Sequence, residues 1–269
     1  KENGVWEPHN TALVEALLRA GDHFVDLGAN LGYFSLVAAH SVTETGHVWA
    51  FEPEPENCRF CERNILINHF EGIVSLHRLA IGDVDETQML YRARHNHGAH
   101  QLARPCADGF DAEGIRVRVT ALDLFVESHP EAASISLIKM DIQGCEMKAF
   151  LGMRKVIARS RERLMAIVEF SPALLTRFDQ EGKGLTRFLR FLEEDVQAVY
   201  VVDSRAQAIA ANVAIAPLRM ADLRRMGSDM LRMDQGHAGG LEHHVDLLLV
   251  FSTRGLALLE ERAEASRRD

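Results

Sequence analysis

The chain has 269 residues, 47% of them hydrophobic and 26% charged, and a formal net charge of −9. Its length is enough for a sizeable buried core and predicts a single domain over residues 1–269. The acidic balance excludes a general phosphate-backbone binder, so we expect no nucleic-acid partner. No apolar run approaches the roughly 20 residues of a membrane-spanning helix, so we expect no membrane span.

The chain has only four cysteines, at positions 58, 61, 106 and 145. They are too few for a disulfide scaffold and indicate a reducing compartment, which favours a cytoplasmic location. The Cys58–Cys61 spacing could suit a metal, but both residues share one face of a predicted helix, so we expect them to pack in the core. Because the chain begins at Lys1 rather than Met, it could be part of a larger protein. A homodimer is a separate possibility that the sequence leaves open.

Helix-like and strand-like segments alternate over the N-terminal part of the chain. A lead-in over residues 1–22 contains an amphipathic helix at residues 11–20. The following order is strand, helix, strand, helix and strand, at residues 23–27, 32–40, 47–52, 55–68 and 73–79. This alternation predicts a parallel sheet covered by helices, which is an α/β fold.

The alternation is interrupted over residues 84–119, where short runs at 88–92 and 115–119 predict an inserted β-hairpin. The α/β order then resumes, with helices at 122–127, 146–159 and 184–194 and strands at 137–141, 165–170 and 198–202. A last strand at 245–250 is expected to pair with the strand at 198–202 and to give the sheet an antiparallel C-terminal edge.

A variable segment at residues 204–244 precedes that strand and is rich in methionine and arginine. We interpret it as a connecting helix and loop with a buried methionine face. The alternative is a flexible cap over a ligand site, because methionine adapts to irregular surfaces.

The most informative segment is a strand that breaks into a glycine turn and restarts as a helix, with the sequence Phe-Val-Asp-Leu-Gly-Ala-Asn-Leu-Gly-Tyr-Phe from residue 24. Its turn has Gly28, Asn30 and Tyr33 where a dinucleotide fingerprint has three glycines, which disfavours NAD. In an open parallel sheet the ligand lies beyond the carboxyl ends of the strands. The residues at such ends are Asp26, Glu52, Ala80, Asp141 and Glu169.

These positions match the parts of one ligand. Asp26 is placed to face an ammonium group, and the amides of residues 28–30 are placed to bind a carboxylate at the start of a helix. Glu52 can accept hydrogen bonds from both hydroxyls of a ribose, and Pro53 then fixes the chain that leaves this contact. An amino acid and a ribose in one ligand indicate S-adenosylmethionine.

The sequence resembles the FkbM-type S-adenosylmethionine-dependent methyltransferases from about residue 6 to residue 170. The matching blocks are Trp6-Glu7-Pro8, residues 21–34, residues 48–57, residues 120–123, residues 138–146 and Ile167-Val168-Glu169. The resemblance implies a Rossmann-like class I methyltransferase fold with a mostly parallel seven-stranded sheet. It also implies methyl transfer to an oxygen of a small molecule, a sugar or a polyketide-type natural product.

The same resemblance supplies a set of candidate cofactor-binding residues. They are Glu7, Asp26, Gly28, Ala29, Asn30, Tyr33, Phe34, Glu52, Pro53, Asn57, Ala80, Ile81 and Asp141. One departure concerns Gln143, which stands where the family usually has Glu. If that position helps to activate the methyl acceptor, the base must lie elsewhere.

Methyl transfer from a sulfonium to a hydroxyl needs alignment and removal of the acceptor proton. Histidine suits that proton transfer, and we hypothesise that His97 or His100, in the inserted loop, is the catalytic base. Asp141 and Glu146 compete for this role, with helix capping as the alternative for Glu146. The loop histidines could instead be solvated, or bind a divalent metal with Asp141 and Glu169, although we expect no metal.

We expect a small-molecule or glycan acceptor. The histidine loop, the arginine-rich segment and the N-terminal helix are expected to line its site, which would suit a polar or anionic acceptor. Two other functions stay open at this point. One is a catalytically silent domain that binds the cofactor within a larger assembly, and the other, less favoured, is an NAD-dependent oxidoreductase.

Overall fold

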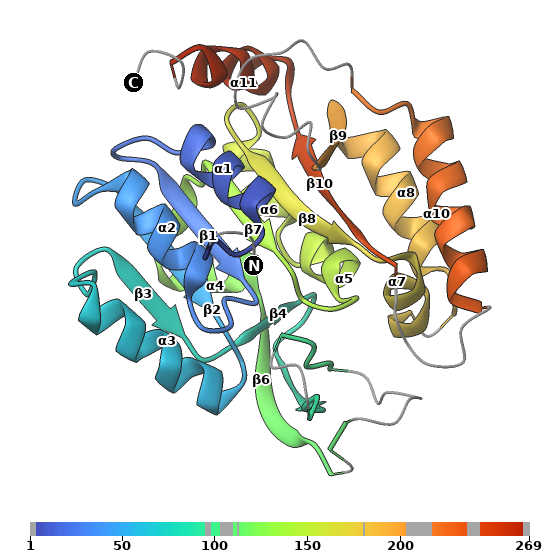
Figure 1. Cartoon of the computed structure of the whole chain (residues 1–269), viewed down its shortest axis with the longest axis horizontal. Coiled ribbons are helices and arrows are strands. Elements are labelled where there is room, and N and C mark those ends of the chain that lie inside the picture. The colour runs from blue at the N-terminus through green and yellow to red at the C-terminus, as the bar shows by residue number, and fades with distance from the viewer. Residues whose placement is uncertain are drawn as a thin grey trace.

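The structure is a computed structural model that describes residues 4–94, 98–102, 110–111, 113–179, 181–202, 217–235 and 243–265. It contains one large sheet with helices on both faces and a smaller second sheet (Figure 1). Among the described residues, no helix combines the length and apolar character needed to cross a membrane.

The large sheet has seven strands, as predicted. Their spatial order is β3 (Val74–His77), β2 (His47–Phe51), β1 (His23–Leu27), β7 (Leu137–Met140), β8 (Met165–Phe170), β10 (Val245–Val250) and β9 (Ala198–Val202). Neighbouring strands from β3 to β8 are parallel, whereas β10 is antiparallel to both β8 and β9. The chain reverses its direction of travel across the sheet between β1 and β7, and ligands bind at such a point in open α/β sheets.

Helices cover the two faces of this sheet in separate groups. On one face the helices are α1 (Pro8–Leu17), α2 (Tyr33–Val42), α3 (Pro55–Ile67) and α11 (Thr253–Ala265). On the other face they are α4 (Leu122–Ser128), α5 (Glu146–Leu151), α6 (Arg154–Ser160), α7 (Pro172–Phe178), α8 (Gly184–Asp195) and α10 (Met220–Gln235). A short 3₁₀ helix at Pro130–Ala133 follows α4.

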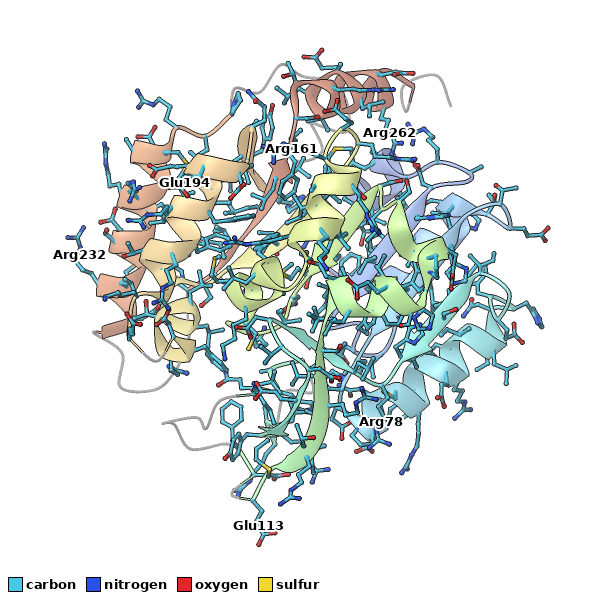
Figure 2. The ribbon with its side chains drawn as sticks, turned by 180° about the vertical axis from the view of Figure 1, so that it is seen from behind. Arg78, Glu113, Arg161, Glu194, Arg232 and Arg262 are labelled. Atoms are coloured by element: carbon cyan, nitrogen blue, oxygen red, sulfur yellow. The ribbon has the colours of Figure 1, made fainter. Side chains whose placement is uncertain are left out.

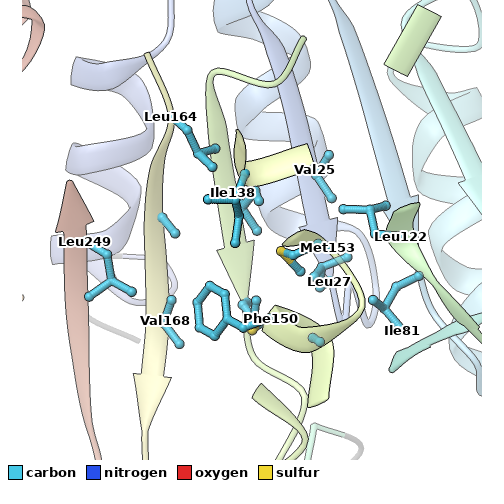
Figure 3. Close-up of a cluster of buried hydrophobic side chains, with 14 of the residues drawn as sticks. Val25, Leu27, Ile81, Leu122, Ile138, Phe150, Met153, Leu164, Val168 and Leu249 are labelled. Atoms are coloured by element: carbon cyan, nitrogen blue, oxygen red, sulfur yellow. The ribbon is translucent and has the colours of Figure 1, made fainter. Parts of the chain in front are cut away.

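Successive residues of a strand pack on opposite faces of the sheet, because side chains alternate along a strand. Val25 and Leu27 of β1 pack with Ile138 in one core cluster, shown in Figure 3, whereas Phe24 belongs to the cluster on the opposite face. A sheet buried on both faces needs nearly continuous apolar strands. The charged exceptions in these strands, Asp26, Lys139, Glu169 and Asp246, are therefore notable.

The inserted hairpin is present and belongs to a second sheet. Its strands β5 (Glu86–Leu90) and β6 (Ile115–Ala121) pair antiparallel. A third strand, β4 (Ala80–Gly82), pairs parallel with β6, so the order is β4-β6-β5. The predicted strand at 73–79 thus ends early, and the chain passes from β3 directly into this second sheet, below the main sheet in Figure 1.

The last strand pairs antiparallel with the strand at 198–202, as predicted, but its predicted place at the very edge of the sheet is wrong. β10 is antiparallel, but it lies between β8 and β9, so β9 forms the edge. The physical reason is burial, because Leu247, Leu248 and Leu249 are all 0% exposed and need cover on both faces and both sides.

The single helix predicted at 146–159 is two helices, α5 and α6. The break falls at Gly152, where the backbone passes so close to β4 that an added Cβ would lie 1.9 Å from the Gly82 carbonyl oxygen. Helices α7 and α11 were not predicted from the sequence.

The methionine-rich segment is helical where the structure describes it, as α10. Met230 is buried and Met226 packs against the same core cluster, which confirms the buried-face interpretation for this part. Arg232 points away from the body of the protein (Figure 2) and pairs with Asp229. Residues 203–216 and 236–242 lie outside the described residues.

The cysteines of α3 pack in the core, as predicted. Cys58 and Cys61 are both buried and free of disulfide bonds. The Cys58 thiol donates to the Glu52 carbonyl oxygen at 3.0 Å. Cys145 is likewise buried and free, and Cys106 lies outside the described residues.

Gly152→Ala should destabilise the protein, because the added Cβ would collide with the Gly82 backbone. We expect a loss of about 1–3 kcal/mol in the free energy of unfolding, the range for overpacked sites, measured by chemical denaturation. Gly72→Ala is the matched control, since its Cβ would meet no atom within 4 Å. Equal stability of the two variants would contradict the close approach of the two segments.

Candidate active site

The glycine turn after β1 is held by the neighbouring strand. The amides of Gly28 and Ala29 both donate to the Phe51 carbonyl oxygen at 3.0 Å, and the Asn30 amide donates to Glu52 Oε2 at 2.9 Å. The prediction that the amides of residues 28–30 bind a ligand carboxylate is therefore wrong, because β2 already satisfies them. Gly28 has a φ of 80°, and a Cβ there would lie 2.1 Å from the Asp141 carbonyl oxygen.

Glu52 is buried at the end of β2 and holds two segments together. Its Oε2 accepts from Asn30 and its Oε1 accepts from the Glu54 amide at 2.8 Å. Burial, only partly offset by these hydrogen bonds, raises the pKa of Glu52 to about 7. Each carboxylate oxygen has a second lone pair, so the group can still accept hydrogen bonds from a ribose.

Asp26 and Lys139 are buried register partners on the adjacent strands β1 and β7. Asp26 accepts a hydrogen bond of 2.6 Å from the Ser35 hydroxyl, which ties β1 to the first turn of α2. Burial raises the pKa of Asp26 to about 6, against the lowering effect of Ser35 and Lys139. The Asp26 carboxyl group thus already makes one structural hydrogen bond, and its contact with an ammonium group of a ligand stays a prediction.

Lys139 is a buried cation at the base of the site, only 2% exposed. Its Nζ lies 3.7 Å from Asp141 Oδ2 and 3.8 Å from Glu7 Oε2, and 5.1 Å from the centre of the Phe34 ring. Nearby carboxylates outweigh burial and keep its pKa above the ordinary value. Sequence reasoning missed this residue, although a lone lysine in the apolar strand 137–140 is a visible signal.

Asn10 joins the two ends of the chain at this cluster. Its amide nitrogen lies 2.7 Å from Glu7 Oε2 and 2.7 Å from Asp246 Oδ2. Glu7 precedes α1 and Asp246 belongs to β10, so the acid cluster around Lys139 draws on both terminal regions.

Asp141 and Glu169 come together at the ends of β7 and β8. Gln143 Nε2 donates to Asp141 Oδ1 and to Glu169 Oε2, both at 2.8 Å. Burial alone would raise the pKa of Asp141, but Lys139 and hydrogen bonds from Glu169 and Gln143 hold it below its ordinary value. Burial and the neighbouring Asp141 charge raise the pKa of Glu169 well above its ordinary value.

These groups surround one cavity of about 920 Å³. Every predicted cofactor-binding residue lines it: Glu7, Asp26, Gly28, Ala29, Asn30, Tyr33, Phe34, Glu52, Pro53, Asn57, Ala80, Ile81 and Asp141. The buried Asn30 Oδ1 and Ser171 Oγ have no hydrogen-bond partner among the described residues. A cavity of this size with polar atoms still to be satisfied fits a polar ligand such as S-adenosylmethionine.

The four catalytic candidates have different positions. Asp141 and His100 line the cavity, whereas Glu146 does not. Glu146 Oε1 accepts from the amides of Gly144 at 3.1 Å and Ile142 at 3.3 Å, which favours the capping alternative. His97 lies outside the described residues.

His100 is oriented unfavourably for a base. Its Nδ1 accepts a hydrogen bond of 3.0 Å from the Ala93 amide, so the neutral ring carries its proton on Nε2. A ring in this tautomer can donate from Nε2 but cannot take up a proton there.

Two further expectations concern the metal and the arginines. The described residues contain no group of three side chains that could hold a metal ion, and His95 and His97 lie outside them. No residue of α10 lines the cavity, so the predicted contribution of its arginines to the acceptor site is wrong for the described part. The arginines of α10 pair instead with neighbouring acids: Arg225 with Asp222, Arg224 with Glu193 and Arg232 with Asp229.

Sequence reasoning also missed two residues of the cavity wall. Ser171 directly follows β8, and His244 directly precedes β10, with its Nδ1 3.7 Å from Glu169 Oε1. His244 follows an irregular stretch of sequence, so no pattern placed it beside β8.

The fold and the site together define a class of protein. A mostly parallel seven-stranded sheet that reverses between β1 and β7, with an acidic residue after β2 facing a cavity at that point, is the Rossmann-like fold of class I methyltransferases. Residues 26–197 match the family described as Methyltransferase FkbM domain. The chain belongs to this family, whose cofactor is S-adenosylmethionine.

Individual relatives are distant. "Methyltransferase 1" of Beauveria bassiana (strain ARSEF 2860) is 23% identical over 150 residues, which is 48% of this chain and 57% of that protein. The chain therefore spans little more than half the length of this curated relative.

Two solved structures are also only distantly similar to this chain. Methyltransferase FkbM from Methylobacillus flagellatus KT has a TM-score of 0.44 and 17% identity, covering 68% of this chain and 40% of that one. The O-methyltransferase TomG from Streptomyces achromogenes, involved in tomaymycin synthesis and solved with S-adenosylmethionine, has a TM-score of 0.49 and 15% identity, covering 93% and 82%. These similarities add nothing to the assignment, which rests on the family match.

Cofactor affinity should rise with pH as Glu52 ionises, since a carboxylate accepts ribose hydroxyls better than a carboxylic acid does. With a pKa of about 7, the ionised fraction grows about tenfold between pH 6 and pH 8. We expect calorimetry with S-adenosylhomocysteine to show an affinity gain of this size. Glu52→Gln should bind more weakly and lose most of the pH dependence, and a flat wild-type profile would contradict the role of Glu52.

Lys139→Met should destabilise the protein strongly, because it leaves Asp141 and Glu7 without their cation. Removing one partner of a fully buried pair costs about 3–5 kcal/mol. Because the side chains of Glu7 and Asp141 are 31% and 32% exposed, we expect a smaller loss of about 1–3 kcal/mol near pH 8. The loss should shrink at about pH 5, where the unpaired carboxylates take up protons. Lys155→Met is the matched control, since its pair with Glu127 is exposed and should contribute under about 1 kcal/mol.

Proposed function

We propose that this protein is an S-adenosylmethionine-dependent methyltransferase that methylates a hydroxyl group on a small molecule, a sugar or a polyketide-type natural product. The observation that supports it is the continuity of the cavity across the β1–β7 reversal point. Glu52 lies at one side of this point and the Asp141–Glu169 pair lies at the other. One ligand can therefore reach both groups.

The strand order orients the cofactor within the cavity. Glu52 after β2 holds the ribose, and Ala80 and Ile81 of β4 lie on the same side, next to the adenine. The amino acid portion then extends past β1 toward β7. This direction brings the methyl group to the side of Asp141, where the cavity offers carboxyl groups.

The charges of the site suit a cationic methyl donor. The donor supplies a methyl group on a positively charged sulfur. Asp26, Glu7 and Asp141 surround the cavity floor with more negative charge than Lys139 neutralises. Lys139 keeps Asp141 ionised, and the walls of the cavity can hold the reacting groups in line.

The test is transfer of a labelled methyl group. Purified protein with methyl-labelled S-adenosylmethionine should label at least one hydroxylated compound in a panel of sugars, polyols, phenols, carboxylic acids and amines. The product should resist mild base, as an ether does and an ester does not. Labelling only of amines or carboxylic acids would contradict transfer to a hydroxyl.

Asp141→Asn should reduce turnover at saturating S-adenosylmethionine by about 10²-fold or more, the usual contribution of a general base, with calorimetry measuring the separate effect of the substitution on cofactor affinity. Asp85→Asn is the matched control, since Asp85 is exposed and pairs with Arg118 in the hairpin. Cofactor binding without transfer to any compound would instead support a catalytically silent domain.

A further inference from the structure

Gln143 brings two carboxyl groups to a single amide. Its Nε2 lies 2.8 Å from an oxygen of Asp141 and 2.8 Å from an oxygen of Glu169. Gln143 has a φ of 54°, a left-handed backbone that non-glycine residues rarely adopt. The loop after β7 is thus held in a costly conformation that aims this side chain between β7 and β8.

The Asp141–Glu169 pair that Gln143 brings together needs one proton. Ionised carboxylates only accept hydrogen bonds, and two of them side by side in a buried place repel each other. Gln143 Nε2 lies 2.8 Å from an oxygen of each carboxyl group, which brings the two groups close together, and one proton held by the pair removes their mutual repulsion. Lys139, 3.7 Å from Asp141 Oδ2, keeps the negative charge on Asp141, so the proton resides on Glu169.

His244 connects this pair to solvent. Its Nδ1 lies 3.7 Å from Glu169 Oε1, a gap that one side-chain rotation or one bridging water spans. The Glu169 side chain is 9% exposed and the His244 side chain 57% exposed. A proton on His244 can therefore leave to bulk water, whereas a proton on Glu169 cannot do so directly.

We propose that Asp141 is the catalytic base, that Gln143 positions the Asp141–Glu169 pair around one proton, and that Glu169 and His244 carry the released proton to solvent. This proposal rests on the proposed function. As the methyl carbon bonds to the acceptor oxygen, the carbon–sulfur bond breaks and its electron pair stays on sulfur. The hydroxyl proton moves to Asp141.

Proton transfer through Glu169 and His244 then returns Asp141 to its ionised form. Asp141 passes its proton to Glu169 as Glu169 gives its own proton to His244 Nδ1, and His244 releases a proton from its other ring nitrogen to water. The remaining titratable groups around the pair belong to five elements or their ends. They are Lys139 on β7, Asp26 on β1, Glu7 before α1, Asp246 on β10 and Glu146 at the start of α5.

Infrared spectroscopy tests the proton directly and needs no acceptor. At about pH 9, above the ordinary range of carboxyl pKa values, the wild-type protein should still show the carbonyl stretch of one protonated carboxyl group. Glu169→Gln should abolish this band. Glu146→Gln is the matched control, a buried glutamate outside the cavity, and should leave the band intact. A wild-type spectrum without the band overturns the proposal, while cofactor binding and methyl transfer are unaffected by that outcome.

The Gln143→Glu variant tests whether Gln143 positions the Asp141–Glu169 pair or only supports the fold. A protonated glutamate has one O–H donor where the glutamine amide has two N–H donors, so it can donate to one of the two carboxyl groups and must accept from the other. Two of the three acids would then be protonated, and the band should roughly double at the same pH. An unchanged band would overturn the role of Gln143. Thermal unfolding of the variant, compared with the wild type, checks that the fold is intact.

His244→Ala tests the path to solvent, using an acceptor that the wild type methylates. Turnover should fall while the infrared band and the affinity for S-adenosylhomocysteine stay unchanged. Added imidazole should restore part of the rate, because it replaces a proton carrier but not a structural contact. Wild-type turnover in this variant, or no response to imidazole, would overturn the exit step.

Discussion

The buried ammonium group of Lys139 is the interaction on which the site depends. Without it, the acidic groups of Glu7 and Asp141 would share one wall of the cavity with no cation between them, where like charges are costly. Lys139 resides on a strand that is otherwise apolar, so its long side chain crosses the core to reach the cavity. The same cation keeps Asp141 ionised while its neighbour Glu169 is protonated.

Two amide side chains also hold the carboxyl groups of this cluster together. Asn10 joins Glu7 to Asp246 on one side of the cluster, and Gln143 joins Asp141 to Glu169 on the other. Each amide nitrogen offers two hydrogens, which two carboxyl oxygens can share. Gln143 therefore bridges the two carboxyl groups without adding a third acid to the site.

The sequence predicted the parallel sheet, the hairpin and the cavity residues, because apolar periodicity and strand ends determine them. It did not predict the hydrogen bonds of the turn, since the amides of Gly28 and Ala29 meet a carbonyl from a different strand. The bridging role of Gln143 depends on a left-handed backbone angle that no local pattern reveals. His244 reaches the site only because β10 inserts beside β8, a long-range pairing.

The placement of β10 has a consequence for how the protein is made. This strand separates β8 from β9 and carries Asp246, the partner of Asn10, so residues from the beginning and the end of the chain meet at the cavity. During synthesis on the ribosome, β9 has no neighbour in the sheet until β10 emerges. The binding site is thus completed only after β10 has emerged, and a nascent chain that stops before β10 has no finished pocket in which to hold a cofactor.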